Sequence, residues 1–181
     1  MQNDSEKLKR EFLENEIETL SIFAAFGRAG VYSPNASEQK KNELKKFLRN
    51  KLRAYGSDYR RGIVSEEKHF SNVKTFSSEI SARCKNILSN GRFRIGIAQK
   101  LLNLYLKYLW VLGWMTKSPW HCPFDYLILS KFPRIESTCM KWTKCDHINC
   151  YKSWVGAARK KAGNSIAKWE LETWNKGGSG F

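Results

Sequence analysis

Long apolar runs and strand-like alternation are both scarce in this sequence. The most apolar stretch, GIAQKLLNLYLKYLWVLGW at 96–114, is interrupted by Asn103 and Lys107 and is too short to span a bilayer comfortably. The opening residues, MQNDSEKLKREF, are polar and include no apolar core of a secretory signal. We therefore expect no signal peptide and no membrane partner, and we expect a cytoplasmic protein.

Acidic residues and cysteines are few as well. Aspartate and glutamate total 17 against 32 lysines and arginines, which gives a formal net charge of +15. A folded protein with this imbalance attracts polyanions, and the aromatic residues that accompany the basic runs favour nucleic acid as the partner. The five cysteines are an odd number without the density of a disulfide scaffold, so we expect free thiols in a reducing compartment.

What the sequence does contain is helical periodicity, because apolar residues recur at three and four positions in several long windows. We predict an all-α fold in one compact domain at 1–175, with amino-terminal helices at 1–80, a central segment at 80–132 and carboxy-terminal helices at 133–175. Residues 176–181, KGGSGF, are expected to form a flexible tail, and the protein is expected to be a monomer.

Cap and turn residues set the expected helix boundaries. Ser5, Ser37 and Ser65 predict N-caps of the first, second and third helices. The segment GSDYRRGIV at 56–64 predicts a loop, and the helix after Ser65 is expected to break and resume before Asn90 and Gly91 end it.

Polar residues form one stripe along the apolar central helix, at spacings of three and four: Gln99, Lys100, Asn103 and Lys107. One interpretation is that the stripe faces water. The other is that it lines a cleft, where a partly desolvated lysine becomes a usable nucleophile. The turn before this helix completes a helix-hairpin-helix unit near 80–113, whose backbone amides could hold a phosphate together with Arg92 and Arg94.

The segment after the central helix, SPWHCPFDYLILSKF, contains a second candidate functional residue, Asp125. Pro123 stiffens the approach to it, and Asp125 can cap a helix that begins at Tyr126. Asp125 also follows Lys100 by 25 positions, about the length needed to descend one helix, cross a loop and return to its starting end. We therefore expect Lys100 and Asp125 to lie near one another.

Residues 80–132 resemble the helix-hairpin-helix DNA glycosylase superfamily, especially the 8-oxoguanine glycosylases and their archaeal relatives. In that family a hairpin leads into a helix with the catalytic lysine, and a loop ending in Pro-x-Asp supplies the catalytic aspartate. Here GIAQK carries Lys100 and CPFD carries Asp125. The archaeal type also has glutamine directly before its lysine and another lysine seven positions later, like Gln99 and Lys107. A related group of antiphage glycosylases removes glucosylated cytosines from viral DNA.

The resemblance implies that the protein flips a damaged or modified base out of DNA and excises it to leave an abasic site, without a cofactor. Asp125 would stabilise the positive charge that develops on the sugar, and Lys100 would either attack the sugar or stabilise the leaving base. The expected base pocket consists of Gln99, Asn103, Lys107, Trp120, His121, Phe124 and Tyr126. The expected DNA contacts are Lys45, Lys46, Arg49, Arg92, Arg94, Arg159 and Lys160.

Other interpretations use the same residues differently. Cys139, Cys145, His147 and Cys150 carry zinc-ligand side chains, but their spacing is not that of a common finger, so no metal site is predicted. The second class is a non-catalytic, helical DNA- or RNA-binding protein of phage or mobile-element origin. Such a protein would use the positive charge and the aromatic residues but would not require Lys100 or Asp125. A protein inhibitor that captures an acidic target is a third class. The carboxy-terminal tryptophans Trp142, Trp154, Trp169 and Trp174 are expected in the core.

Overall fold

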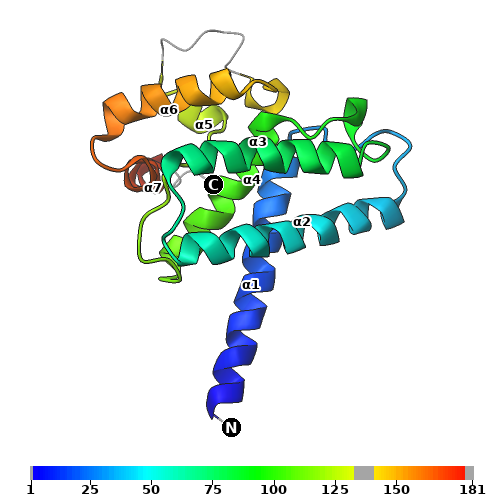
Figure 1. Ribbon diagram of the computed structural model, residues 1–181. Coiled ribbons are helices and arrows are strands. Elements are labelled where there is room, and N and C mark those ends of the chain that lie inside the picture. The colour runs from blue at the N-terminus through cyan, green and yellow to red at the C-terminus, as the bar shows by residue number, and fades with distance from the viewer. Residues whose placement is uncertain (1, 133–140, 178–181) are drawn as a thin grey trace.

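The computed structural model describes residues 2–132 and 141–177, and within these residues the regular structure is helical throughout (Figure 1). The prediction of an all-α fold is confirmed. The helices are α1 (Gln2–Phe26), α2 (Glu38–Arg60), α3 (Glu66–Arg83), α4 (Ile95–Val111), α5 (Tyr126–Leu129), α6 (Ile148–Ala162) and α7 (Ile166–Gly177). Two single turns of 3-10 helix are η1 (Ser89–Gly91) and η3 (Trp142–Lys144).

Two of the three helix starts predicted from cap residues are correct, whereas α1 begins at Gln2, so the predicted cap at Ser5 is wrong. The side chain of Ser37 accepts a hydrogen bond from the amide of Lys40, and that of Ser65 accepts one from the amide of Lys68. Each serine therefore satisfies one of the amides that have no partner inside the helix.

The predicted ends of three helices differ from the structure. Helix α2 continues through the first half of the segment expected to be a loop, and α3 runs from Glu66 to Arg83 without the expected interruption. Gly56 lies inside α2. A Cβ atom at this position would come within 2.9 Å of the Tyr105 hydroxyl, so the absence of a side chain allows α2 and α4 to approach closely. Helix α7 extends to Gly177, two residues into the expected tail, and residues 178–181 lie outside the described part of the chain.

Helix α4 is the centre of the fold. It contacts α1, α2, α3 and α6, and nearly all its side chains from Ile95 to Leu109 are buried. A helix that is apolar on almost every side requires this central position. Figure 1 shows α3 crossing in front of α4, with the amino-terminal half of α1 extending beyond the other helices.

Candidate functional site

Lys100 and Asp125 are in contact. Lys100 lies in the second turn of α4, and its Nζ is 3.1 Å from Oδ2 of Asp125, the N-cap residue of α5. The other carboxylate oxygen accepts a hydrogen bond from the amide of Ile128 at 3.3 Å. The two side chains are 12% and 21% exposed, so this ion pair is partly desolvated and still reachable from solvent.

Trp142, which the sequence placed simply in the core, is the second neighbour of Lys100. The ammonium lies 4.5 Å from the centroid of the Trp142 ring, within the range of a cation–π contact. The backbone at Trp142 packs directly on the start of α4, where a Cβ atom at position 96 would come within 1.8 Å of the Trp142 carbonyl oxygen. Only glycine fits at Gly96, and the amide of Gly96 donates to the Cys145 carbonyl at 2.9 Å. The sequence signal for this contact is the glycine itself.

Gln99 fixes the segment that carries Asp125. Its side-chain nitrogen donates to the Phe124 carbonyl at 2.7 Å, and its side-chain oxygen accepts from the Phe124 amide at 3.1 Å. Gln99 is fully buried, so these two bonds to the backbone of one residue hold the Pro-x-Asp segment against α4. The position of Asp125 beside Lys100 follows from this pairing.

A buried polar network continues from Gln99 along α4. Asn103 donates to the Tyr151 hydroxyl at 3.0 Å, and the same hydroxyl lies 2.7 Å from Nδ1 of His121 and 3.1 Å from Nε2 of His69. Nε2 of His121 is 2.7 Å from a carboxylate oxygen of Glu66. The network therefore connects α3, α4, α6 and the loop before α5.

Burial keeps both histidines of this network neutral. Desolvation, with a smaller effect from Arg159, lowers the pKa of His121 to about 3. Desolvation and the neighbouring His121 lower the pKa of His69 well below its usual value. Desolvation likewise raises the pKa of the Tyr151 hydroxyl. At neutral pH the network consists of uncharged donors and acceptors, apart from Glu66 at its edge.

Lys107, the last residue of the polar stripe, forms a buried ion pair. Its ammonium lies 2.9 Å from the carboxylate of Glu170, and the two side chains are 11% and 2% exposed. Desolvation raises the pKa of Glu170, while Lys107 opposes that shift. This pair joins the second half of α4 to α7.

Most side chains expected in a base pocket are therefore occupied by internal contacts. Gln99, Asn103, His121 and Phe124 are fully buried, and Lys107 is bound to Glu170. Trp120 and Tyr126 differ, since they are 45% and 69% exposed.

The arginines of the hairpin also have partners within the chain. Arg92 forms an ion pair with Asp146 at 2.6 Å, and Arg94 donates to the Thr143 carbonyl at 3.2 Å. Asp146 in turn accepts from the amide of Ile95 at 3.2 Å and so caps the start of α4. This amide and that of Gly96 are thus already bonded at the place where the sequence suggested a phosphate.

The other expected DNA contacts are distributed over two helices. Lys46 is exposed and Lys45 half-buried on α2, while Arg49 binds the Thr19 hydroxyl and Glu18 and so holds α1. Lys160 is exposed on α6, and Arg159 pairs with Glu66.

The cysteines do not all meet the expectation of free thiols. Cys84, Cys122 and Cys145 are free and buried, whereas Cys150 is disulfide-bonded, so that expectation is wrong at Cys150. Cys139 lies outside the described residues. Within 2–132 and 141–177, no group of three or more histidine, cysteine or acidic side chains is arranged to hold a metal ion.

No family model, no curated protein and no solved structure matches this chain. None of the helices in the described ranges combines the length and the apolarity needed to cross a membrane.

Proposed function

We propose that this protein is a DNA glycosylase that excises a damaged or modified base and leaves an abasic site. The observation that carries the proposal is the Lys100 and Asp125 pair. A lysine at the start of a helix that follows a hairpin contacts an aspartate at the cap of a second helix, 25 positions later, at 3.1 Å. The net charge of +15 supports a polyanionic substrate.

The proposed reaction is hydrolysis of the bond between the base and C1′ of its sugar. The Asp125 carboxylate accepts a proton from the attacking water and stabilises the positive charge that develops on the sugar. The bonding electron pair leaves with the base, and the Lys100 ammonium donates a proton to it. The Asp125 carboxylate and the Trp142 indole both contact the Lys100 ammonium. These contacts support a role for Lys100 as a proton donor rather than as a nucleophile.

Substitution of Asp125 by Asn tests this proposal. Asparagine retains the N-cap role, so Asp125→Asn should fold, while the loss of the carboxylate should reduce base excision by at least about a hundredfold. The assay uses DNAs with 8-oxoguanine, uracil, alkylated bases or glucosylated hydroxymethylcytosine, followed by alkali cleavage at abasic sites. Asp58→Asn, at an exposed ion pair with Arg61, is the matched control and should leave excision unchanged.

The same assay identifies the substrate and the role of Lys100. Excision of the glucosylated cytosine would point to antiphage defence, and excision of 8-oxoguanine to repair. Borohydride should trap no covalent complex during hydrolysis, whereas a complex that is lost in Lys100→Gln would assign Lys100 as the nucleophile of a lyase. Full activity in Asp125→Asn would rule out the proposal.

A non-catalytic nucleic-acid-binding protein is the second candidate. It is favoured by the structural roles already held by Asp125 as a cap and by Lys100 as its ion-pair partner. This candidate predicts DNA binding without loss of any base, and equal affinity in Asp125→Asn and the natural protein.

A further inference from the structure

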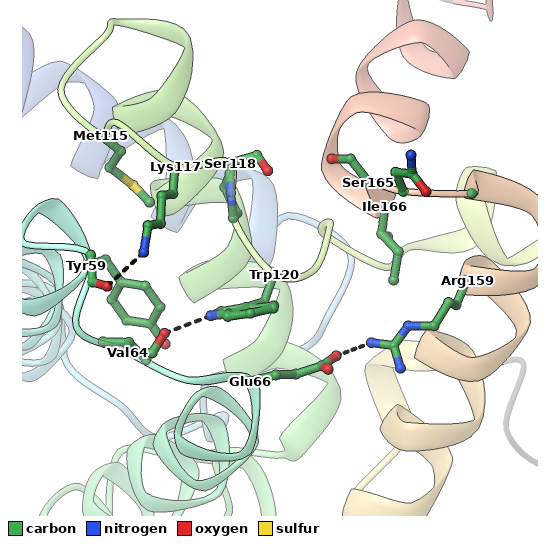
Figure 2. Close-up of a pocket in the computed structure, with 14 residues that line it drawn as sticks. Tyr59, Val64, Glu66, Met115, Lys117, Ser118, Trp120, Arg159, Ser165 and Ile166 are labelled. Carbon is green, nitrogen blue, oxygen red and sulfur yellow. Dashed lines mark hydrogen bonds and ion pairs between the residues drawn. The ribbon is translucent and has the colours of Figure 1, made fainter.

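A cavity of about 660 Å³ lies between three of the loops that connect the helices. Its walls come from the loop between α2 and α3, the loop between α4 and α5, and the start of α7 (Figure 2). Neither Lys100 nor Asp125 lines it, so it is separate from the candidate catalytic pair. The volume is that of a pocket for a small organic ligand rather than for a single ion.

Trp120 provides an aromatic surface in this cavity. Its indole nitrogen donates to the Val64 carbonyl at 2.8 Å, which fixes the edge of the ring. The residue remains 45% exposed, whereas Trp142 and Trp154 are buried. In Figure 2 the indole lies between Val64 on one side and Arg159 on the other, with Ser165 and Ile166 on the opposite wall. A fixed and open indole is suited to stacking with a planar ligand.

Cationic and hydrogen-bonding groups surround the indole. Arg159 and Lys117 contribute two positive charges, and Glu66 is the sole acidic side chain among the lining residues. Glu66 is paired with Arg159 and His121, so among the described residues Lys117 is the lining cation outside an ion pair, and the lining as a whole keeps a net positive charge. Ser165 caps α7 by accepting from the amide of Lys168 at 3.2 Å, so the amino-terminal end of this 12-residue helix faces the cavity. A helix start next to two cations favours an anionic group.

We propose that this cavity, the Trp120 pocket, binds a nucleotide. The base stacks on the indole of Trp120, and the phosphate is held by Arg159, Lys117 and the start of α7. The proposal does not depend on glycosylase activity. A free mononucleotide and an unpaired nucleotide of a DNA strand present the same chemistry to the pocket, so both are tested.

Calorimetric titration of the purified protein with thymidine 5′-monophosphate and with a single-stranded hexathymidylate tests the proposal. Trp120→Leu should weaken binding of both ligands about tenfold or more, because stacking on one aromatic side chain contributes that much. Arg159→Gln should weaken both by removing a phosphate contact. Trp174→Leu, at a tryptophan that is 39% exposed on α7 outside the pocket, is the matched control and should bind normally.

The two ligands distinguish the source of the nucleotide. Equal affinity for both indicates a free nucleotide, and much tighter binding of the hexamer indicates a DNA strand; both outcomes support the pocket. The proposal is overturned if neither ligand binds, or if Trp120→Leu and Arg159→Gln both bind as tightly as the natural protein. Calorimetry detects no base excision, so either proposal can fail without the other.

Discussion

His69 and His121 are fully buried, and burial lowers the proton affinity of both imidazoles. Both contact the Tyr151 hydroxyl, whose environment contains no countercharge for an imidazolium apart from Glu66 beside His121. The pKa of each is lowered, to about 3 for His121. The folded protein therefore binds fewer protons than the unfolded chain below the ordinary histidine pKa of about 6.5.

This difference predicts that the free energy of unfolding falls as the pH is lowered from about 6.5 toward 5. Each buried histidine should contribute a loss whose slope grows toward about 1.4 kcal/mol per pH unit as the pH nears 5, because only the unfolded chain takes up the proton. Urea denaturation at several pH values measures the slope. His121→Gln, which keeps a neutral polar side chain, should reduce the slope. An unchanged slope in His121→Gln would contradict the assignment of a neutral buried imidazole.

Among the elements, the contact between the start of α4 and η3 depends on one missing side chain. Gly96 lies where the backbone of Trp142 approaches too closely for a Cβ atom, and Trp142 in turn covers Lys100. One side of the Lys100 environment therefore depends on an element, η3, that follows it by about 40 residues in the sequence.

Substitution of Gly96 by Ala should force α4 and η3 apart, since the neighbouring atom belongs to the backbone and cannot rotate away. We expect a loss of about 3 kcal/mol or more in the free energy of unfolding by urea, up to failure to fold. Gly156→Ala is the control, because Gly156 lies within α6 and a Cβ atom there meets nothing within 4 Å. It should stabilise the protein by up to about 1 kcal/mol. Equal stability of the two variants would refute the steric role of Gly96.

Across the whole molecule, the formal charge of +15 remains in large excess even though many arginines form internal ion pairs. If the protein binds DNA as proposed, its surface would release counterions from the phosphate backbone, so affinity should fall steeply with salt. Arg49 binds α1, so its substitution would disturb the fold as well as DNA binding. Within the described residues, Lys45 and Lys46 on the same helix form no hydrogen bond or ion pair with another helix.

Replacement of Lys45 and Lys46 by Gln should weaken DNA binding to the same extent for all sequences and flatten its salt dependence. If both lysines contact phosphates, the slope of log affinity against log salt should decrease by about two, nearly one for each contact. Fluorescence anisotropy with a labelled duplex measures this slope. Replacement of Lys168 and Lys176, exposed on α7, by Gln removes the same charge elsewhere. An equal effect of the two pairs would contradict a DNA path along α2.

Several local features of this protein could be predicted from the sequence alone. Apolar periodicity predicts the helical fold, and the serines at 37 and 65 predict two helix starts, because periodicity and capping depend on residues within one or two turns. The meeting of Lys100 and Asp125 could be predicted as well, since one helix and one return loop separate them.

Which partners the polar residues of α4 take was decided only by the tertiary structure. Asn103 meets Tyr151 48 positions away, and Lys107 meets Glu170 63 positions away. A polar stripe satisfies its hydrogen bonds equally well in water or against buried partners, so its spacing does not reveal which way it faces. For the same reason the sequence did not show that Arg92 and Arg94 of the hairpin would bind the segment at 143–146 instead of a phosphate. Sequence spacing thus predicted the helical fold and the contact between Lys100 and Asp125, and long-range packing decided which polar groups remained accessible to a ligand.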